Sequence, residues 1–188
     1  MKFLKFILVV CISLAFTSCG DDSAEPPYAL TKENIAGKYN LSSFNLDMDS
    51  SSEVSSGIFA TFSSAKFVGD TFQLDLEMNS DGTYSLTGLF RVVSSISIVG
   101  GTNPTVPPLG INFNNSGNFS INNLKNTITF NSKSGNFLDL SSLELPSFEP
   151  VFNVTVFNEN SYSITQEAEN VNDKIKIKTN SKISFIRK

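Results

Sequence analysis

The chain has 188 residues, with 14 Lys and Arg against 18 Asp and Glu, no His and two Cys. This length suits one domain with a terminal extension. The absence of His excludes Ser-His-Asp and Cys-His catalysis and every His-containing zinc site, and two Cys are too few for a zinc ribbon or a disulfide scaffold. The net charge of −4 argues against electrostatic binding of nucleic acid. We therefore expect a protein that is not an enzyme and that has no catalytic residues, no metal and no cofactor.

The N-terminus begins with a basic segment and continues with an apolar one. Lys2 and Lys5 precede an uncharged apolar run over residues 6–16, and the chain turns polar after Cys19. The run is too short to span a bilayer, which takes about 20 residues, and it is typical of the apolar core of a secretory signal. An ordinary cleaved signal, with Cys19 as a bystander, is the alternative to the lipoprotein signal described next.

Residues 16–19 (Phe-Thr-Ser-Cys) resemble the lipobox of bacterial lipoproteins. That family prefers Leu at the third position before the Cys, where this chain has Phe16, and Bacteroidetes-type lipoproteins tolerate this departure. The resemblance implies that residues 1–18 are a signal peptide and that Cys19 becomes the acylated N-terminus, which would incorporate palmitate. Acyl chains stabilise membrane binding by roughly 0.8 kcal/mol per buried CH₂, so several of them hold a domain on the outer membrane.

Two further short motifs follow Cys19. Asp21-Asp22 resembles the acidic signal that exports Bacteroidetes lipoproteins to the cell surface, and a solvated tether is the alternative interpretation. Asp22-Ser23-Ala24 resembles the three-residue O-glycosylation site of those bacteria, which implies Ser23 as the acceptor. The resemblance therefore implies a membrane-anchored protein of the bacterial outer membrane, with the cell surface as a candidate face.

The mature chain divides into a tether and one domain. Residues 19–31 lack an apolar period and contain Pro26-Pro27, so we expect the lipidated Cys and a flexible tether there. The domain is expected over residues 32–188. Thr31 can cap one helical turn at its start.

Alternating apolar and polar residues predict β-structure in the domain. Residues 72–78 and 84–90 alternate on either side of Asn79-Ser80-Asp81-Gly82, whose Asp-Gly suits a tight hairpin turn. The second strand continues through residues 92–98. Further short strands are expected around residues 119–121, 128–130, 137–140, 152–156, 162–164, 175–177 and 183–185. Their spacing favours an antiparallel barrel or sandwich, and a meander is the simplest topology.

Several motifs resemble bacterial lipocalin-like lipoproteins. Residues 35–41 look like the opening Gly-x-Trp strand, with Tyr39 in place of Trp. Residues 79–90 resemble the "DGTY…G-x-aromatic" hairpin, and residues 117–121 with 126–130 resemble the "G-x-W-x-I…n-x-I-T-F" pair. The resemblance implies an all-β, antiparallel up-and-down barrel of the calycin or lipocalin type with about 8–10 strands. Small barrels of this type can hold one small ligand.

In lipocalins the first-strand Trp packs against a basic residue at the end of the barrel. The resemblance implies that Tyr39 takes the place of this ring and that Arg187, or Lys182, stacks on it as a cation–π pair worth roughly 0.5–2 kcal/mol. We therefore expect Tyr39 and Arg187 to close the narrow end of the barrel.

Two functions are open at this stage. The first is a carrier that binds a small apolar ligand inside the barrel, with the lining formed by Tyr39, Leu41, Leu74, Tyr84, Leu86 and Phe119. The second is a non-catalytic structural or interaction module of the cell surface, whose core is filled. Inward side chains look alike in both cases, so the sequence leaves the choice open.

The charged residues offer weaker candidates. Residues 47–53 place oxygens at alternate positions, as at the start of a calcium loop, but a solvated Ser-rich turn is the simpler interpretation. Asp75 and Glu77 share one strand face, where we expect solvent rather than a glycosidase pair. Lys174, Lys176 and Lys178 also share a face, which is typical of a solvated or edge-guarding row and could alternatively bind anionic glycans or phosphates.

Overall fold

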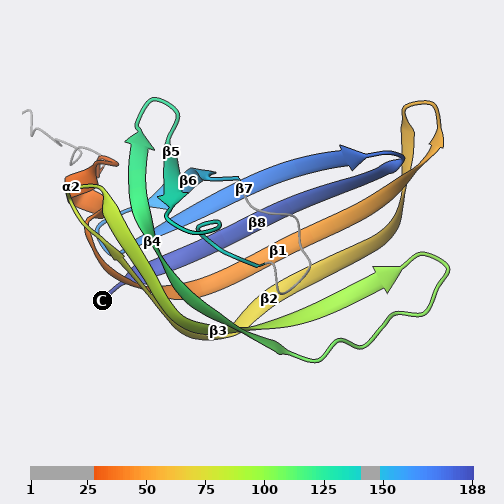
Figure 1. The fold of residues 1–188 in the computed structure, drawn as a ribbon, viewed down its shortest axis with the longest axis horizontal. Coiled ribbons are helices and arrows are strands. Elements are labelled where there is room, and N and C mark those ends of the chain that lie inside the picture. The colour runs from red at the N-terminus through yellow and green to blue at the C-terminus, as the bar shows by residue number, and fades with distance from the viewer. Residues whose placement is uncertain (1–27, 141–148) are drawn as a thin grey trace, which may run out of the picture.

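Eight antiparallel strands form a closed barrel in which every strand pairs with its neighbours along the chain and β8 pairs with β1 (Figure 1). The computed structural model describes residues 28–140 and 149–188. The fold is therefore the predicted all-β up-and-down barrel. One helical turn, α2 (Lys32–Ile35), precedes the strands. The strands are β1 (Gly37–Ser55), β2 (Ile58–Met78), β3 (Thr83–Ile98), β4 (Leu109–Asn122), β5 (Thr127–Ser132), β6 (Val151–Phe157), β7 (Ser161–Asn172) and β8 (Ile175–Arg187).

The alternation predicted around the first hairpin holds in three dimensions. Leu74, Leu76 and Met78 of β2 are buried, and the residues between them face solvent. Asp75 pairs with Lys188 at 2.8 Å and Glu77 lies 3.6 Å from Lys38, both at exposed positions. The two carboxylates therefore belong to the outward face, as expected for an amphipathic strand.

The turn between β2 and β3 is stabilised by its own side chains. Gly82 has φ +87°, a conformation that glycine adopts without strain. The Asp81 carboxylate accepts hydrogen bonds from the Thr83 amide (2.8 Å) and hydroxyl (2.7 Å). These bonds favour the ionised carboxylate and hold the pKa of Asp81 below its usual value. The predicted hairpin is therefore confirmed.

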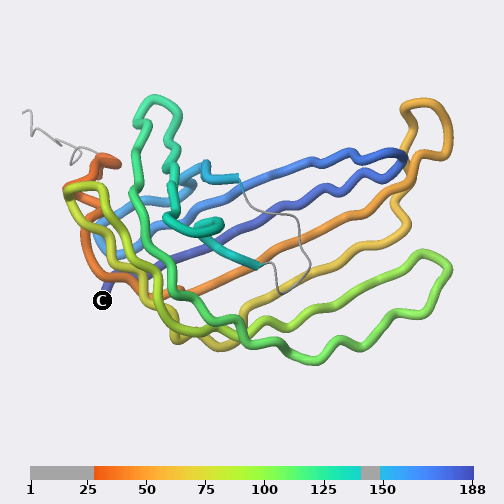
Figure 2. Tube along the Cα trace, in the orientation of Figure 1, coloured from red at the N-terminus to blue at the C-terminus, as the bar shows by residue number. Residues whose placement is uncertain are grey.

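The barrel is complete only at one end. Pairing of β3 with β4 stops at Val92–Leu109, and pairing of β6 with β7 stops at Asn153–Thr165. Beyond these points β3, β2, β1, β8 and β7 continue as a curved open sheet (Figure 2). We call the end beside α2 the closed half and this open sheet the flared half.

Two local predictions were wrong. Residues 47–53, expected as a Ser-rich turn, lie within β1, because pairing with both β2 and β8 gives their backbone groups partners on two sides. Residues 137–140, expected as a strand, form a loop. Consecutive Phe137 and Leu138 are both buried, which a strand with one inward face cannot achieve, and Gly135 (φ +66°) turns the chain just before them.

The helical turn at the start of the domain is capped as expected. The Thr31 hydroxyl accepts a hydrogen bond from the Asn34 amide at 3.2 Å, and Ile35 is fully buried. α2 therefore packs an apolar residue onto the closed end of the barrel.

Candidate functional site

Tyr39 and Arg187 meet at the closed end of the barrel. The Arg187 guanidinium lies 5.2 Å from the centre of the Tyr39 ring, and its Nη2 donates to the Tyr39 hydroxyl at 2.7 Å. The same nitrogen donates to the Asn34 carbonyl at 2.6 Å, and the Tyr39 hydroxyl donates to the Ile35 carbonyl at 2.8 Å. The pair thus ties α2 to both the first and the last strand. Lys182, the alternative partner, is exposed and lies opposite Asn45.

Further aromatic rings stack behind Tyr39. The Tyr162 ring lies edge-on to Tyr39 at 5.0 Å and stacks on Phe185 at 4.8 Å. Burial raises the pKa of Tyr39, and it raises the pKa of the fully buried Tyr162 well above its usual value, because the phenolate loses its hydration. These rings fill the barrel where it narrows.

The raised pKa of Tyr162 predicts alkaline destabilisation. The unfolded chain releases this proton near pH 10, whereas the folded chain retains it, so the contribution to stability is complete below about pH 10 and is lost as the pH rises through the folded pKa. We expect Tyr162→Phe to flatten the fall in free energy of unfolding between about pH 10 and pH 12, measured by urea titration at each pH. An unchanged pH slope in this variant would contradict the assignment.

The contact between Tyr39 and Arg187, which we call the closing pair, should stabilise the fold measurably. In a double-mutant cycle with Tyr39→Phe and Arg187→Met, we expect a coupling energy of about 1–2 kcal/mol, from one hydrogen bond and one cation–π contact. The control cycle uses the exposed pair Lys188 and Asp75, where we expect less than about 1 kcal/mol. Equal coupling in the two cycles would show that the closing pair contributes no more than a surface ion pair.

The six residues expected to line a ligand cavity are core residues. Tyr39, Leu41, Leu74, Tyr84, Leu86 and Phe119 belong to one hydrophobic cluster, and each is at most 2% exposed. A cavity that admits a ligand would leave accessible surface on the side chains that line it. These six residues leave almost none, so the closed half is filled where they lie.

A segment of the chain itself completes this filling. After β5 the loop over residues 133–140, which we call the plug, turns into the barrel and buries Phe137, Leu138 and Leu140. The Phe137 ring stacks on Phe130 with 3.7 Å between ring centres, and it contacts Tyr84 edge-on at 5.5 Å. The plug therefore occupies the interior in which a lipocalin-like barrel would hold a ligand.

One buried amide holds the plug in place. Asn115 of β4 donates from Nδ2 to the carbonyls of Asn136 (2.6 Å) and Phe137 (3.3 Å) and to the Ser132 hydroxyl (3.2 Å). Its Oδ1 is buried without a hydrogen-bond partner. The Ser132 hydroxyl also meets that of Tyr84 at 2.6 Å. Asn115 was not predicted, and only its inward place in the alternation of β4, beside Phe113, could have indicated a buried polar residue.

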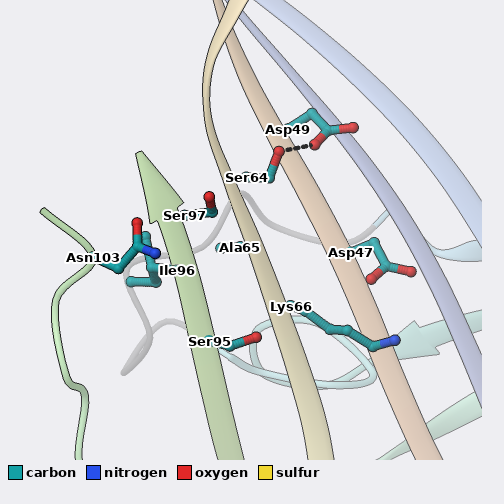
Figure 3. Close-up of a pocket in the computed structure, with 9 residues that line it drawn as sticks. All are labelled: Asp47, Asp49, Ser64, Ala65, Lys66, Ser95, Ile96, Ser97 and Asn103. Carbon is teal, nitrogen blue, oxygen red and sulfur yellow. Dashed lines mark hydrogen bonds between the residues drawn. The ribbon is translucent and has the colours of Figure 1, made fainter. Parts of the chain in front are cut away.

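The outer face of the flared half has a shallow polar groove of about 340 Å³ (Figure 3). Its carboxylates are Asp47 and Asp49 of β1, and the Asp49 carboxylate accepts from the Ser64 hydroxyl at 2.7 Å. Lys66 of β2 pairs across the strands with Asp47. The other lining residues are Ala65, Ser95, Ile96, Ser97 and Asn103.

Asp47 and Asp49 belong to the segment whose oxygen spacing is similar to the start of a calcium loop. Within residues 28–140 and 149–188, no group of three or more acidic or Cys side chains is placed to hold a metal ion. The groove offers hydroxyl, amide, ammonium and carboxylate groups, which suit weak contacts with a polar surface. Sequence reasoning missed its Ser and Lys members, because only the strand register brings them beside the aspartates.

The row of lysines over residues 174–178 lies at the start of β8 and in the turn before it. Lys176 pairs with Glu169 at 2.8 Å and lies 5.6 Å from the centre of the Phe59 ring. Cys19, Ser23 and the expected signal peptide over residues 1–18 lie outside the described residues. Among the described residues, no helix is long and apolar enough to cross a membrane.

Comparisons with known proteins do not assign this chain to a family. No protein-family model matches the chain, and no curated protein matches it. Among solved structures, the match to Ail, the attachment invasion locus protein of Yersinia pestis, has 8% sequence identity and a TM-score of 0.26, and it covers 82% of this chain and 100% of that one. A TM-score this low carries no argument about this protein.

Proposed function

We propose that this protein is a lipid-anchored, non-enzymatic interaction module of a bacterial outer membrane, related to the lipocalin-like lipoproteins. The observation that carries this proposal is the contrast between the two halves of the barrel. The closed half is filled by its own side chains and by the plug, whereas the flared half exposes an open sheet with a polar outer groove. The functional surface is then the flared half rather than the barrel interior.

The position of the first described residues supports an orientation in which the flared half points away from the membrane. The Tyr28 hydroxyl donates to the Asn34 carbonyl at 3.1 Å, and its ring lies 5.0 Å from Phe157 at the closed end. A tether from an acylated Cys19 therefore joins the domain at this end. β1 alone runs 19 residues, or roughly 60 Å, towards the far tip. Anchoring by the N-terminus would point the flared half away from the membrane.

The distribution of polarity supports a domain that lies in water beside the membrane. Barrels that span an outer membrane carry an apolar band on the outside and polar residues within. Here the alternation is reversed, because aromatic and aliphatic residues fill the interior while Lys38, Asp75 and Glu77 lie on the outside. An anchor outside the barrel is then needed for membrane attachment, which Cys19 would supply.

A carrier of a small apolar ligand is the second candidate, and one observation favours it. On the inner face of the flared half, Met48 and Ile96 pack against the core but are only partly buried, and Ile98 is exposed. An apolar ligand would bind there, beside the plug, and not at the six residues first expected.

Two measurements test these proposals. Native mass spectrometry of the protein purified from its own membrane separates the two candidates: the module predicts the mass of the acylated chain alone, with any glycan at Ser23, and a further non-covalent mass would instead establish the carrier. Metabolic labelling with an alkyne analogue of palmitate tests the anchor. We expect incorporation in the parent chain and none in Cys19→Ser, and an unlabelled parent chain would refute lipidation.

A further inference from the structure

In the flared half, β7 has a strand partner on only one side among the described residues. β6 pairs with β7 only as far as Thr165, and β7 continues to Asn172 with β8 on one side. At the point where β6 leaves, the Gln166 side chain takes the place of a strand partner. It donates to the carbonyls of Glu149 and Val151 (2.7 Å each) and accepts from the Glu149 amide (3.1 Å). Beyond this point no described residue pairs with this side of β7.

The direction of the backbone groups along this edge follows from the hydrogen bonds. The Asn160 carbonyl accepts from the Arg187 amide, so residue 160 faces β8, and the register from there to Asn172 has no irregularity. Because successive residues of a strand point their N–H and C=O groups to opposite sides, Glu167, Glu169 and Val171 direct theirs to the free edge. Among the described residues, no hydrogen bond reaches these six groups.

Nothing within the described chain covers this edge. Glu167, Glu169 and Asn170 are exposed, and Val171 is 53% exposed. The other free edge of the flared half, along β3, differs. There Asn103 from the following loop accepts from the Ile98 amide, and the loop runs back beside the strand to β4 (Figure 1). An unpaired, uncovered edge is a template for one more strand.

The charges on this edge determine which strand can pair with it. The Glu167 and Glu169 side chains both lie on the outer face of the sheet. Glu169 already pairs with Lys176 of β8 at 2.8 Å, whereas Glu167 lies opposite Asn180 and has no ion pair among the described residues. Antiparallel registers that keep the faces matched place Glu167 or Glu169 of one copy opposite Glu167, Glu169 or Asp173 of the other. Like charges directly opposite each other are destabilising, so self-pairing is disfavoured. A partner strand with positive charge at these positions is favoured by the same rule.

We infer that the β7 edge from Glu167 to Asn172 binds an extended segment of a partner protein that carries Lys or Arg at two alternate positions, by strand addition antiparallel to β7. The basic residues lie opposite Glu167 and Glu169, and an aliphatic residue lies opposite Val171. Small or β-branched residues face Ala168 and Asn170 on the inner side. The edge offers about 20 Å of backbone, and backbone hydrogen bonds supply affinity while the alternate side chains supply specificity. This inference rests on the proposed interaction module and names its partner class.

The test uses the full-length protein as purified from the membrane and a fluorescent peptide, acetyl-Thr-Ile-Thr-Lys-Val-Lys-Thr-amide. We expect binding by anisotropy with a dissociation constant below about 1 mM. Hydrogen exchange should then show protection of the amides of Glu167, Glu169 and Val171. A second peptide carries N-methyl groups on the backbone nitrogens of its Ile and Lys residues, which keeps the charge but removes the strand's donors. We expect it not to bind.

Charge reversal on the protein completes the test. Glu167→Lys with Glu169→Lys should weaken binding of the peptide at least about tenfold, since two favourable pairs become unfavourable. The matched control, Glu77→Lys with Glu159→Lys, changes the net charge equally and also breaks one surface ion pair, that of Glu77 with Lys38 at the closed half, and should leave binding within about twofold. Absence of binding, equal binding of the N-methylated peptide, or equal weakening in both double variants would overturn the inference. None of these results alters the native mass or the acyl labelling, so the proposed function is tested independently.

Discussion

Replacing Phe137 with Ala should lower the free energy of unfolding by about 3–5 kcal/mol, as for other fully buried Phe→Ala changes. The ring is 1% exposed, stacks on Phe130 and contacts Tyr84 and Phe152 edge-on. Its removal leaves a cavity in the barrel, and the plug loses its largest contact. Guanidinium chloride titration followed by circular dichroism measures the change.

The control for Phe137→Ala is Leu124→Ala, because the Leu124 side chain is 99% exposed in the turn between β4 and β5. We expect a change within about 0.5 kcal/mol there. A loss below about 1 kcal/mol for Phe137→Ala would mean that the plug does not pack in the barrel in solution. The filled closed half, on which the proposed function rests, would then have to be abandoned.

Replacing Gly88 with Ala should cost roughly 2–6 kcal/mol, the sum of backbone strain and overpacking. Gly88 has φ +124°, which side-chain-bearing residues rarely adopt. A Cβ there would also lie 2.0 Å from the Gln73 carbonyl oxygen and 3.1 Å from the Leu74 Cα. The backbone of β2 cannot move away without breaking its pairing with β3.

Gly110→Ala is the matched control for Gly88→Ala, since it lies on the neighbouring strand. A Cβ at Gly110 meets only the tip of the flexible Leu89 side chain, at 3.4 Å. Thermal unfolding should therefore show a large loss for Gly88→Ala and a change within about 0.5 kcal/mol for Gly110→Ala. Similar melting temperatures for the two variants would show that β2 and β3 do not approach as closely as described.

The local rules predicted much of the fold because they depend on neighbours along the chain. The first hairpin could be predicted from the alternation over residues 72–78 and from the Asp81-Gly82 turn. The helical cap could be predicted from Thr31 alone. The same rules failed at residues 47–53, where Ser and Asp suggest a turn. Pairing on both sides outweighs this weak preference, and β1 continues through the segment.

Among the candidate sites, too, the sequence predicted some features and missed others. Tyr39 and Arg187 are 148 positions apart, and their contact was expected only from the resemblance to lipocalins. In the structure, Arg187 Nη2 lies 2.7 Å from the Tyr39 hydroxyl oxygen. No local signal distinguished a core residue such as Leu86 from a cavity-lining one. That distinction depends on the plug, which Asn115 holds from 21 residues away.

Composition and alternation were enough to establish a β-protein without histidine chemistry whose strands are apolar on one face, since both properties are set residue by residue. Three features were decided only when the chain closed on itself. These are the filling of the interior by residues 133–140, the widening of the barrel beyond β4 and β6, and the edge of β7 that no described residue pairs. Each depends on strand lengths and register across the whole ring, because the space inside a barrel and the partners at its edges belong to all the strands together.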